Sequence, residues 1–217
     1  MISPQDQNFI ISVVEKNIQE CLTECDFDPT VKEPGHTYGE KVEEKLVDKL
    51  VQKYPEKFSH PEKKKGKGKQ TRKMEDMIWI PTSALINIKL GYEKKQGQPN
   101  MVSFTRLMEK FHKEEIDSYY IFIIDVIGKT KTTLRTSLYF FNLYDYLDYV
   151  NYNYGTGQVM LKEKQFLDNY DLNKYFDHTK KDIMLKLEEI DRNAYESHRN
   201  LKQKQYEKRR EIFNDYC

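Results

Sequence analysis

Two short apolar runs joined by a three-residue turn constrain the fold of this chain more than any other feature. The first run is Met77-Ile78-Trp79-Ile80, the second covers residues 84–90, and Pro81-Thr82-Ser83 lies between them. Runs of this length that are rich in β-branched and aromatic residues and bounded by turn residues are typical of β-strands. We therefore predict two sequential strands here, which can pair as a hairpin.

Other segments show helical or strand periodicity and set the fold class. Helices are predicted upstream of the two strands, at 5–25 and 38–54. Downstream we predict, in order, a helix at 100–112, strands at 119–126, 134–143 and 159–161, and one long or two shorter helices from 179 onward. The order helix, strand, strand, helix, strand, strand, helix predicts an α/β domain with a mixed sheet.

Length and composition favour a single intracellular domain. The 217 residues suit one domain of ordinary size. The chain contains no run of eighteen apolar residues, so we expect no transmembrane helix, and no signal peptide is visible at its start. The cysteines number three, and none lies in a CxxC pair or at zinc-ligand spacing, which favours a reducing, cytoplasmic setting.

Two charged segments leave alternatives open. The lysine-rich stretch 63–73 has no apolar residue and is predicted to be an exposed loop, either solvated or in contact with phosphates. The formal net charge of the whole chain is only +1, so a nucleic-acid partner is compatible with the composition but not required by it. For the charged C-terminal helix, a packing or dimer element is the more frequent outcome and a nucleic-acid arm the rarer one.

The residues that suggest chemistry flank and occupy the two predicted strands. Asp76 immediately precedes the first strand, and alternation places Asn87 and Lys89 on one face of the second. Hydrolysis of a phosphodiester requires a hard divalent cation held by oxygen ligands, and a nearby cation to stabilise the phosphate. Each residue alone has an ordinary alternative, because solvated lysines and aspartates at strand ends are common.

The order of four motifs makes this chain resemble the PD-(D/E)xK nucleases, and among them the type II restriction enzymes of the EcoRV and HincII branch. The resemblance covers about residues 38–126 and implies a restriction-endonuclease-like core. The motifs are Gly39-Glu40-x-x-Glu43, Glu75-Asp76 followed by an aliphatic run, Ile86-Asn87-Ile88-Lys89, and Gln98-Pro99-Asn100-Met101-Val102-Ser103.

The resemblance implies roles for individual residues. Asp76 would hold a Mg²⁺ ion, the backbone carbonyl of Ile88 would add a ligand, and Lys89 would position the attacking water. Glu40 would lie beside the site or bind a second ion through water. The remaining implied contacts are with DNA: Gln98, Asn100 and Ser103 in the segment that approaches the bases, and Lys94, Lys95 and Arg106 on phosphates.

Position 87 departs from the family pattern, which has Asp or Glu there. Asn87 offers a neutral oxygen that cannot offset the charge of a metal ion. A glutamate of the preceding helix (Glu40, Glu43 or Glu44) is one replacement, with Glu40 the first choice. The alternatives are that Asn87 serves as a neutral ligand or that the chain is an inactivated variant.

The resemblance as a whole implies a type II restriction endonuclease. Such an enzyme cleaves double-stranded DNA with Mg²⁺ at a short specific site, and the palindromic form of most such sites predicts a homodimer. We expect one domain over 1–217, with a nuclease core at about 38–162 and a helical region at about 163–217. The alternatives are a repair nuclease or junction resolvase of the same fold, a DNA-binding or protein-interaction module with a decayed site, and a chance pattern in an unrelated α/β protein.

Overall fold

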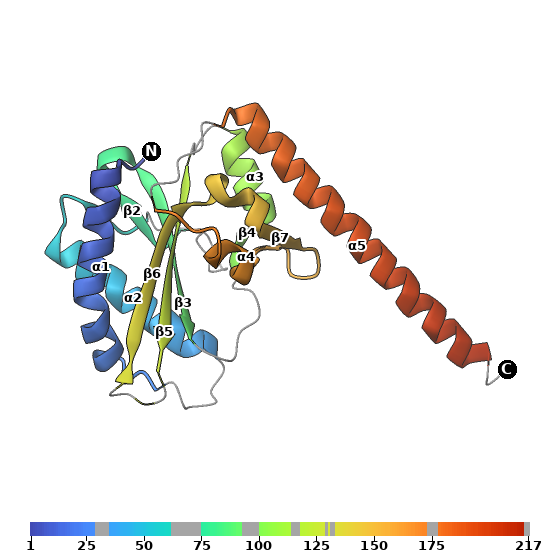
Figure 1. Ribbon diagram of the computed structural model, residues 1–217, viewed down its shortest axis with the longest axis horizontal. Coiled ribbons are helices and arrows are strands. Elements are labelled where there is room, and N and C mark those ends of the chain that lie inside the picture. Colours follow the sequence, from blue (N-terminus) through green and yellow to red (C-terminus); the bar gives the residue numbers. More distant parts are fainter. Residues whose placement is uncertain are drawn as a thin grey trace, which may run out of the picture.

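The computed structural model describes residues 1–28, 35–61, 75–92, 100–113, 118–128, 130, 133–172 and 178–214 (Figure 1). Its helices are α1 (Pro4–Glu24), α2 (Gly35–Lys53), α3 (Phe104–His112), α4 (Glu163–Leu167) and α5 (Lys180–Asn214). Its strands are β1 (Phe58–Ser59), β2 (Met77–Trp79), β3 (Ala84–Tyr92), β4 (Asn100–Ser103), β5 (Tyr119–Ile127), β6 (Arg135–Asn142), β7 (Val150–Asn153) and β8 (Gln158–Leu161). Short 3₁₀ helices η1 (Ile80–Thr82) and η3 (Leu143–Tyr149) complete the fold.

A five-stranded mixed sheet in the order β1-β2-β3-β5-β6 forms the centre of the molecule. β3 runs parallel to β5, whereas the β1–β2, β2–β3 and β5–β6 pairs are antiparallel. The turn between β2 and β3 passes through Ser83, whose φ of 54° is left-handed. The predicted α/β class with a mixed sheet is confirmed, and so are the two adjacent strands that follow the second helix.

Helices α1 and α2 cover one face of this sheet (Figure 1). Ser3 caps α1 by accepting a hydrogen bond from the Asp6 N–H, and Pro4 occupies the first turn, where its missing N–H costs nothing. The apolar stripe of α1 packs with that of α2 over the side chains of Ile86 and Ile88 from β3. Burial of these stripes, rather than helix propensity, stabilises the two helices.

The opposite face carries a second apolar core. It is built from α3, η3, α4, the first turns of α5 and a separate three-stranded sheet in the order β4-β8-β7. Because alternate residues of β5 point to opposite faces, Phe122 and Ile124 join the first core while Ile121 and Ile123 join the second. β5 is therefore shared by both cores.

The prediction of a helix over 100–112 is wrong in its first turn. Residues 100–103 form β4, which pairs antiparallel with β8 through Val102 and Val159, and the helix begins only at Phe104. The partner strand lies far along the sequence, so local periodicity carries no sign of it. The short strands β1 and β7 and the helices η3 and α4 were not predicted. The helical pattern after residue 179 forms one helix of 35 residues.

Among the described residues, no helix combines the length and the apolar character that crossing a bilayer requires.

The shared strand predicts a graded loss of stability. Phe122 is fully buried and its ring lies 5.2 Å from that of Phe140, so Phe122→Ala should lower the free energy of unfolding by about 3–5 kcal/mol. Ile124→Val removes one buried methylene and should cost about 0.5–1.5 kcal/mol. Urea denaturation measures both, with exposed Leu185→Ala as the control, expected within about 0.5 kcal/mol of the parent. Equal losses in the three variants would contradict this assignment of the core.

Candidate functional site

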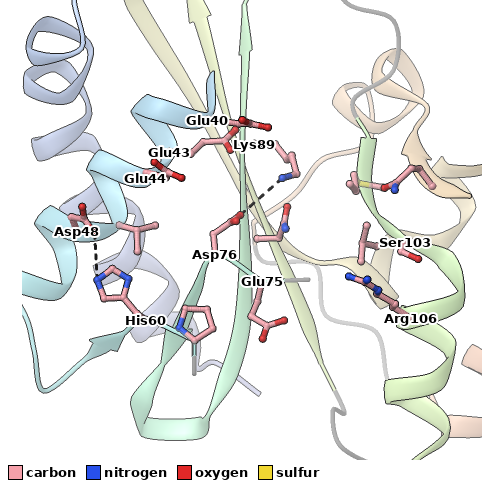
Figure 2. Close-up of a pocket in the computed structure, with 16 residues that line it drawn as sticks. Glu40, Glu43, Glu44, Asp48, His60, Glu75, Asp76, Lys89, Ser103 and Arg106 are labelled. Atoms are coloured by element: carbon pink, nitrogen blue, oxygen red, sulfur yellow. Dashed lines mark ion pairs between the residues drawn. The ribbon is translucent and has the colours of Figure 1, made fainter. Parts of the chain in front are cut away.

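A pocket of about 930 Å³ lies at the edge of the central sheet (Figure 2). Helix α2 forms one wall, β2 and β3 form the floor, and β4 with the start of α3 forms the opposite wall. Eight residues that the sequence singled out line this one pocket: Glu40, Glu43, Glu44, Asp76, Asn87, Lys89, Ser103 and Arg106.

Asp76 lies where β2 begins and where its pairing with β3 ends. Its backbone N–H donates to the Ile86 carbonyl at 3.0 Å, and its carboxylate Oδ2 accepts the Ile88 N–H at 2.7 Å. The Asp76 side chain thus satisfies the Ile88 N–H, a backbone donor of β3 that lies beyond the last residue of β3 that pairs with β2. This bond fixes the carboxylate against the edge of the sheet.

Lys89 lies beside this carboxylate. Its Nζ is 4.0 Å from Asp76 Oδ2, and both side chains are partly buried, with 25% and 33% exposed. Asn87 lies two residues earlier, on the same face of β3, and is 5% exposed. The predicted approach of Asp76 and Lys89 on neighbouring strands is therefore confirmed as geometry.

Glu43 connects α2 to the same strand. Its Oε1 accepts the Leu90 N–H at 2.7 Å, so it satisfies the next outward-facing donor of β3 after the one bound by Asp76. Figure 2 shows Glu43 and Glu40 on the side of the pocket that Lys89 approaches. Glu40 is exposed, whereas Glu43 is partly buried and hydrogen-bonded to the floor.

Burial controls the ionisation of both edge carboxylates. It raises the pKa of Glu43 from 4.5 to about 7, and the charges of Asp76 and Glu40 add to this rise, while Lys89 and the Leu90 N–H oppose it. Burial also raises the pKa of Asp76, against the opposing effects of Lys89 and the Ile88 N–H. The site therefore holds more negative charge than its environment readily accommodates.

Several acidic residues of the pocket were not singled out as site residues from the sequence. Asp48 pairs with His60 at 3.3 Å, and Glu75 pairs with Lys110 at 3.4 Å. With Glu40 and Glu44, Asp48 follows an i, i+4, i+8 spacing that places all three on one face of α2. That spacing was the available signal, but it also occurs on ordinary solvated helices.

The far wall carries the remaining predicted residues that the structure describes. Ser103 ends β4, and Arg106 lies in the first turn of α3, across the pocket from Lys89 (Figure 2). The backbone of Asn100 pairs with Met160 in β8. Other candidates lie outside the described residues: Lys94, Lys95, Gln98 and the lysine-rich stretch 63–73.

The donor atoms of the pocket fit a hard cation whose coordination is completed by solvent or substrate. Among the described residues, no three Asp, Glu, His or Cys side chains are arranged to hold an ion by themselves. Mg²⁺ normally keeps several waters and takes only one or two carboxylates from the protein, together with substrate phosphates. Asp76 supplies one carboxylate, and the Ile88 carbonyl faces the same edge of β3 as the Ile88 N–H that Asp76 binds.

Comparisons with known proteins add no assignment: neither the scan against protein-family models nor the search of curated proteins returned a match.

The raised pKa of Glu43 predicts a pH-dependent stability. The folded chain retains a proton on Glu43 between about pH 4.5 and 7 that the unfolded chain has released. This contribution is complete below about pH 4.5 and is lost as the pH rises through about 7. Glu43→Gln abolishes the ionisation, so the unfolding free energy of the parent relative to this variant should fall across that window. Urea titrations with EDTA at several pH values measure it; a difference that stays constant would contradict the assignment.

Proposed function

We propose that this protein is a Mg²⁺-dependent nuclease with a restriction-endonuclease-like core that cleaves double-stranded DNA at a short specific site. One observation carries the proposal: Asp76 and Lys89, from adjacent strands, lie 4.0 Å apart at the open edge of a mixed sheet. This arrangement offers a cation ligand and a cationic side chain to the same phosphate. A homodimer acting on a palindromic site is the form we expect of such an enzyme.

The chemistry assigns separate tasks to the residues of the floor. Asp76 and the Ile88 carbonyl would hold the ion, which when bound lowers the pKa of a coordinated water and neutralises phosphate charge. Lys89 orients the attacking water and stabilises the charge that develops on the phosphate oxygens. The water oxygen bonds to phosphorus and releases a proton to solvent, while the bond from phosphorus to the leaving sugar oxygen breaks and that oxygen takes up a proton from solvent. Arg106, on the opposite wall, is placed to contact a neighbouring phosphate.

The charge of the pocket supports a requirement for cations. Lys89 and Arg106 are the lysine and arginine residues among the described lining residues, and His60 is paired with Asp48. Against them stand six carboxylates: Glu40, Glu43, Glu44, Asp48, Glu75 and Asp76. Even with Glu43 partly protonated near pH 7 and Glu75 paired with Lys110, such a surface repels phosphate unless bound cations offset its charge. Phosphate entry into the pocket should therefore depend on a divalent ion.

The missing acid at position 87 is best supplied by Glu43. Both Glu40 and Glu43 line the pocket, but only Glu43 has a described hydrogen bond to β3, through the Leu90 N–H. The charges of Asp76 and Lys89 in turn act on the Glu43 carboxyl, where Asp76 raises its pKa and Lys89 lowers it. We therefore prefer Glu43 to Glu40 as the second carboxylate, acting directly or through a water on the ion.

A second candidate function is a DNA-binding or protein-interaction module whose nuclease site has decayed. Asn87 is the observation that favours it, since a neutral amide stands where the nucleases that the sequence resembles carry an acid. A repair nuclease or junction resolvase of the same fold is the third candidate. Cleavage of a plain duplex at one repeated sequence would distinguish the specific endonuclease from both.

Plasmid cleavage with Mg²⁺, followed by sequencing of the ends, tests the proposal. Lys89→Ala should abolish cleavage because the variant lacks the cation that acts on the water and the phosphate, while DNA binding persists. Gel-shift assays measure binding on the same samples, and EDTA should stop cleavage by the parent. Lys164→Ala, exposed on α4 and outside the pocket lining, is the control and should cleave like the parent. Full activity of Lys89→Ala would remove the assignment.

Position 87 separates the explanations of the missing acid. If Glu43 supplies it, Asn87→Asp should leave cleavage unchanged or lower it by crowding negative charge, and Glu43→Gln should abolish Mg²⁺-dependent cleavage. Glu15→Gln, exposed on α1, is the matched control. The rates are measured on the plasmid used above. A rise of orders of magnitude in Asn87→Asp, with Glu43→Gln still active, would instead identify the chain as an inactivated variant.

A further inference from the structure

The first turns of helix α5 are buried against the body. Ile183, Leu187 and Ile190 are buried in the second core, and Lys186 pairs with Asp148 of η3 at 2.7 Å. Beyond these turns the helix projects away from the sheet, on the side opposite α1 (Figure 1). With 35 residues and a rise of about 1.5 Å each, it extends about 50 Å.

A small aromatic cluster supports the middle of the helix. The ring of Tyr154, in the turn after β7, lies 5.8 Å from that of Tyr195 and 5.3 Å from that of His198. Beyond this cluster the described side chains from Arg199 to Glu207 are all exposed. An isolated helical segment of this kind gains little stability in water without a partner, because packing supplies most helical stability.

Cations and tyrosines share one exposed face of the projecting part. Arg192, Tyr195, Arg199, Lys202 and Tyr206 follow alternating spacings of three and four residues and so lie along one stripe. Tyr195 and Tyr206 are 50% and 54% exposed, and the three cations between and beside them are exposed as well. This face is distinct from the one that Ile183, Leu187 and Ile190 bury against the body.

The charge of the segment indicates what covers this face. From residue 192 to 210 the sequence holds seven lysines and arginines against two glutamates, although the whole chain is nearly neutral. A second copy of the same face would oppose like charges and be repelled. A phosphate backbone has complementary charge, and arginine, lysine and tyrosine side chains all contact phosphate oxygens.

We propose that this face of α5 is a second DNA contact, separate from the pocket, which binds the duplex backbone without reading its sequence. The choice of DNA as the nucleic acid rests on the proposed function, whereas the phosphate chemistry rests on the helix itself. Since the pocket repels phosphate until a cation is bound, α5 binds DNA in the absence of divalent ions. It would hold the duplex on the protein before the pocket engages it.

The test measures binding of a labelled duplex of random sequence, in EDTA, by fluorescence anisotropy from about 50 to 300 mM salt. The paired variant Arg199→Gln with Lys202→Gln should weaken binding by roughly tenfold or more at 0.1 M salt and lower the magnitude of the slope of log K against log salt by about 2. Lys16→Gln with Lys45→Gln makes the same change in charge on α1 and α2, and should preserve the slope. Far-UV circular dichroism confirms that each variant keeps its helices.

Each result decides the proposal. Unchanged affinity and slope in the α5 variant would overturn it, as would equal losses in the α1 and α2 control. A change of sedimentation mass from dimer to monomer without loss of DNA binding would assign the face to a second copy and also overturn it. If the parent protein does not cut plasmid DNA with Mg²⁺, the effect of the α5 variant on binding still stands, so failure of the nuclease proposal is recognised separately.

Discussion

The site depends on how the outer edge of β3 satisfies its backbone donors. β2 pairs with only the first residues of β3, and beyond that point no described strand lies beside the Ile88 and Leu90 N–H groups on this edge. Two carboxylates, from Asp76 and Glu43, accept these bonds at 2.7 Å each. A buried N–H without an acceptor costs about 1–3 kcal/mol, so the same acids that give the pocket its charge also complete the sheet. The shortness of β2 is what leaves room for them.

The same arrangement explains why the carboxylates resist ionisation. They are held at a partly dry edge by bonds that favour the charged form, beside Lys89, which also favours it, yet burial still raises the pKa of both. Desolvation therefore exceeds the local attractions. A divalent ion would relieve this imbalance, since it adds positive charge where the protein has supplied too little. Electrostatic strain of this kind is common at functional sites.

The sequence was informative where structure is local. Alternation placed Asn87 and Lys89 on one face, and the apolar runs identified β2, β3 and β5. Both signals depend only on residues close together in the sequence, since side chains of a strand alternate between its two faces. β4 was assigned to the following helix because its pairing with β8 is a long-range contact. The bond from Glu43 to the Leu90 N–H was equally hidden, since it depends on where β2 ends and on how α2 packs across the sheet. Sequence motifs thus identified residues at the floor of the pocket and named Glu43 among three candidate acids, but they placed Glu40 first.

The two walls of the pocket belong to different halves of the molecule. α2 is buried in the core that it shares with α1, whereas β4 and α3 pack into the core on the other face of the sheet, and β3 contributes to both. Substitutions that reshape the β4–α3 wall therefore leave the packing beneath Glu43 and Asp76 largely intact. Under the proposed function, the wall that would select a substrate can diverge in evolution while the floor that would hold the ion is conserved. Descendants of one ancestral chain could in this way acquire different preferences without rebuilding their chemistry.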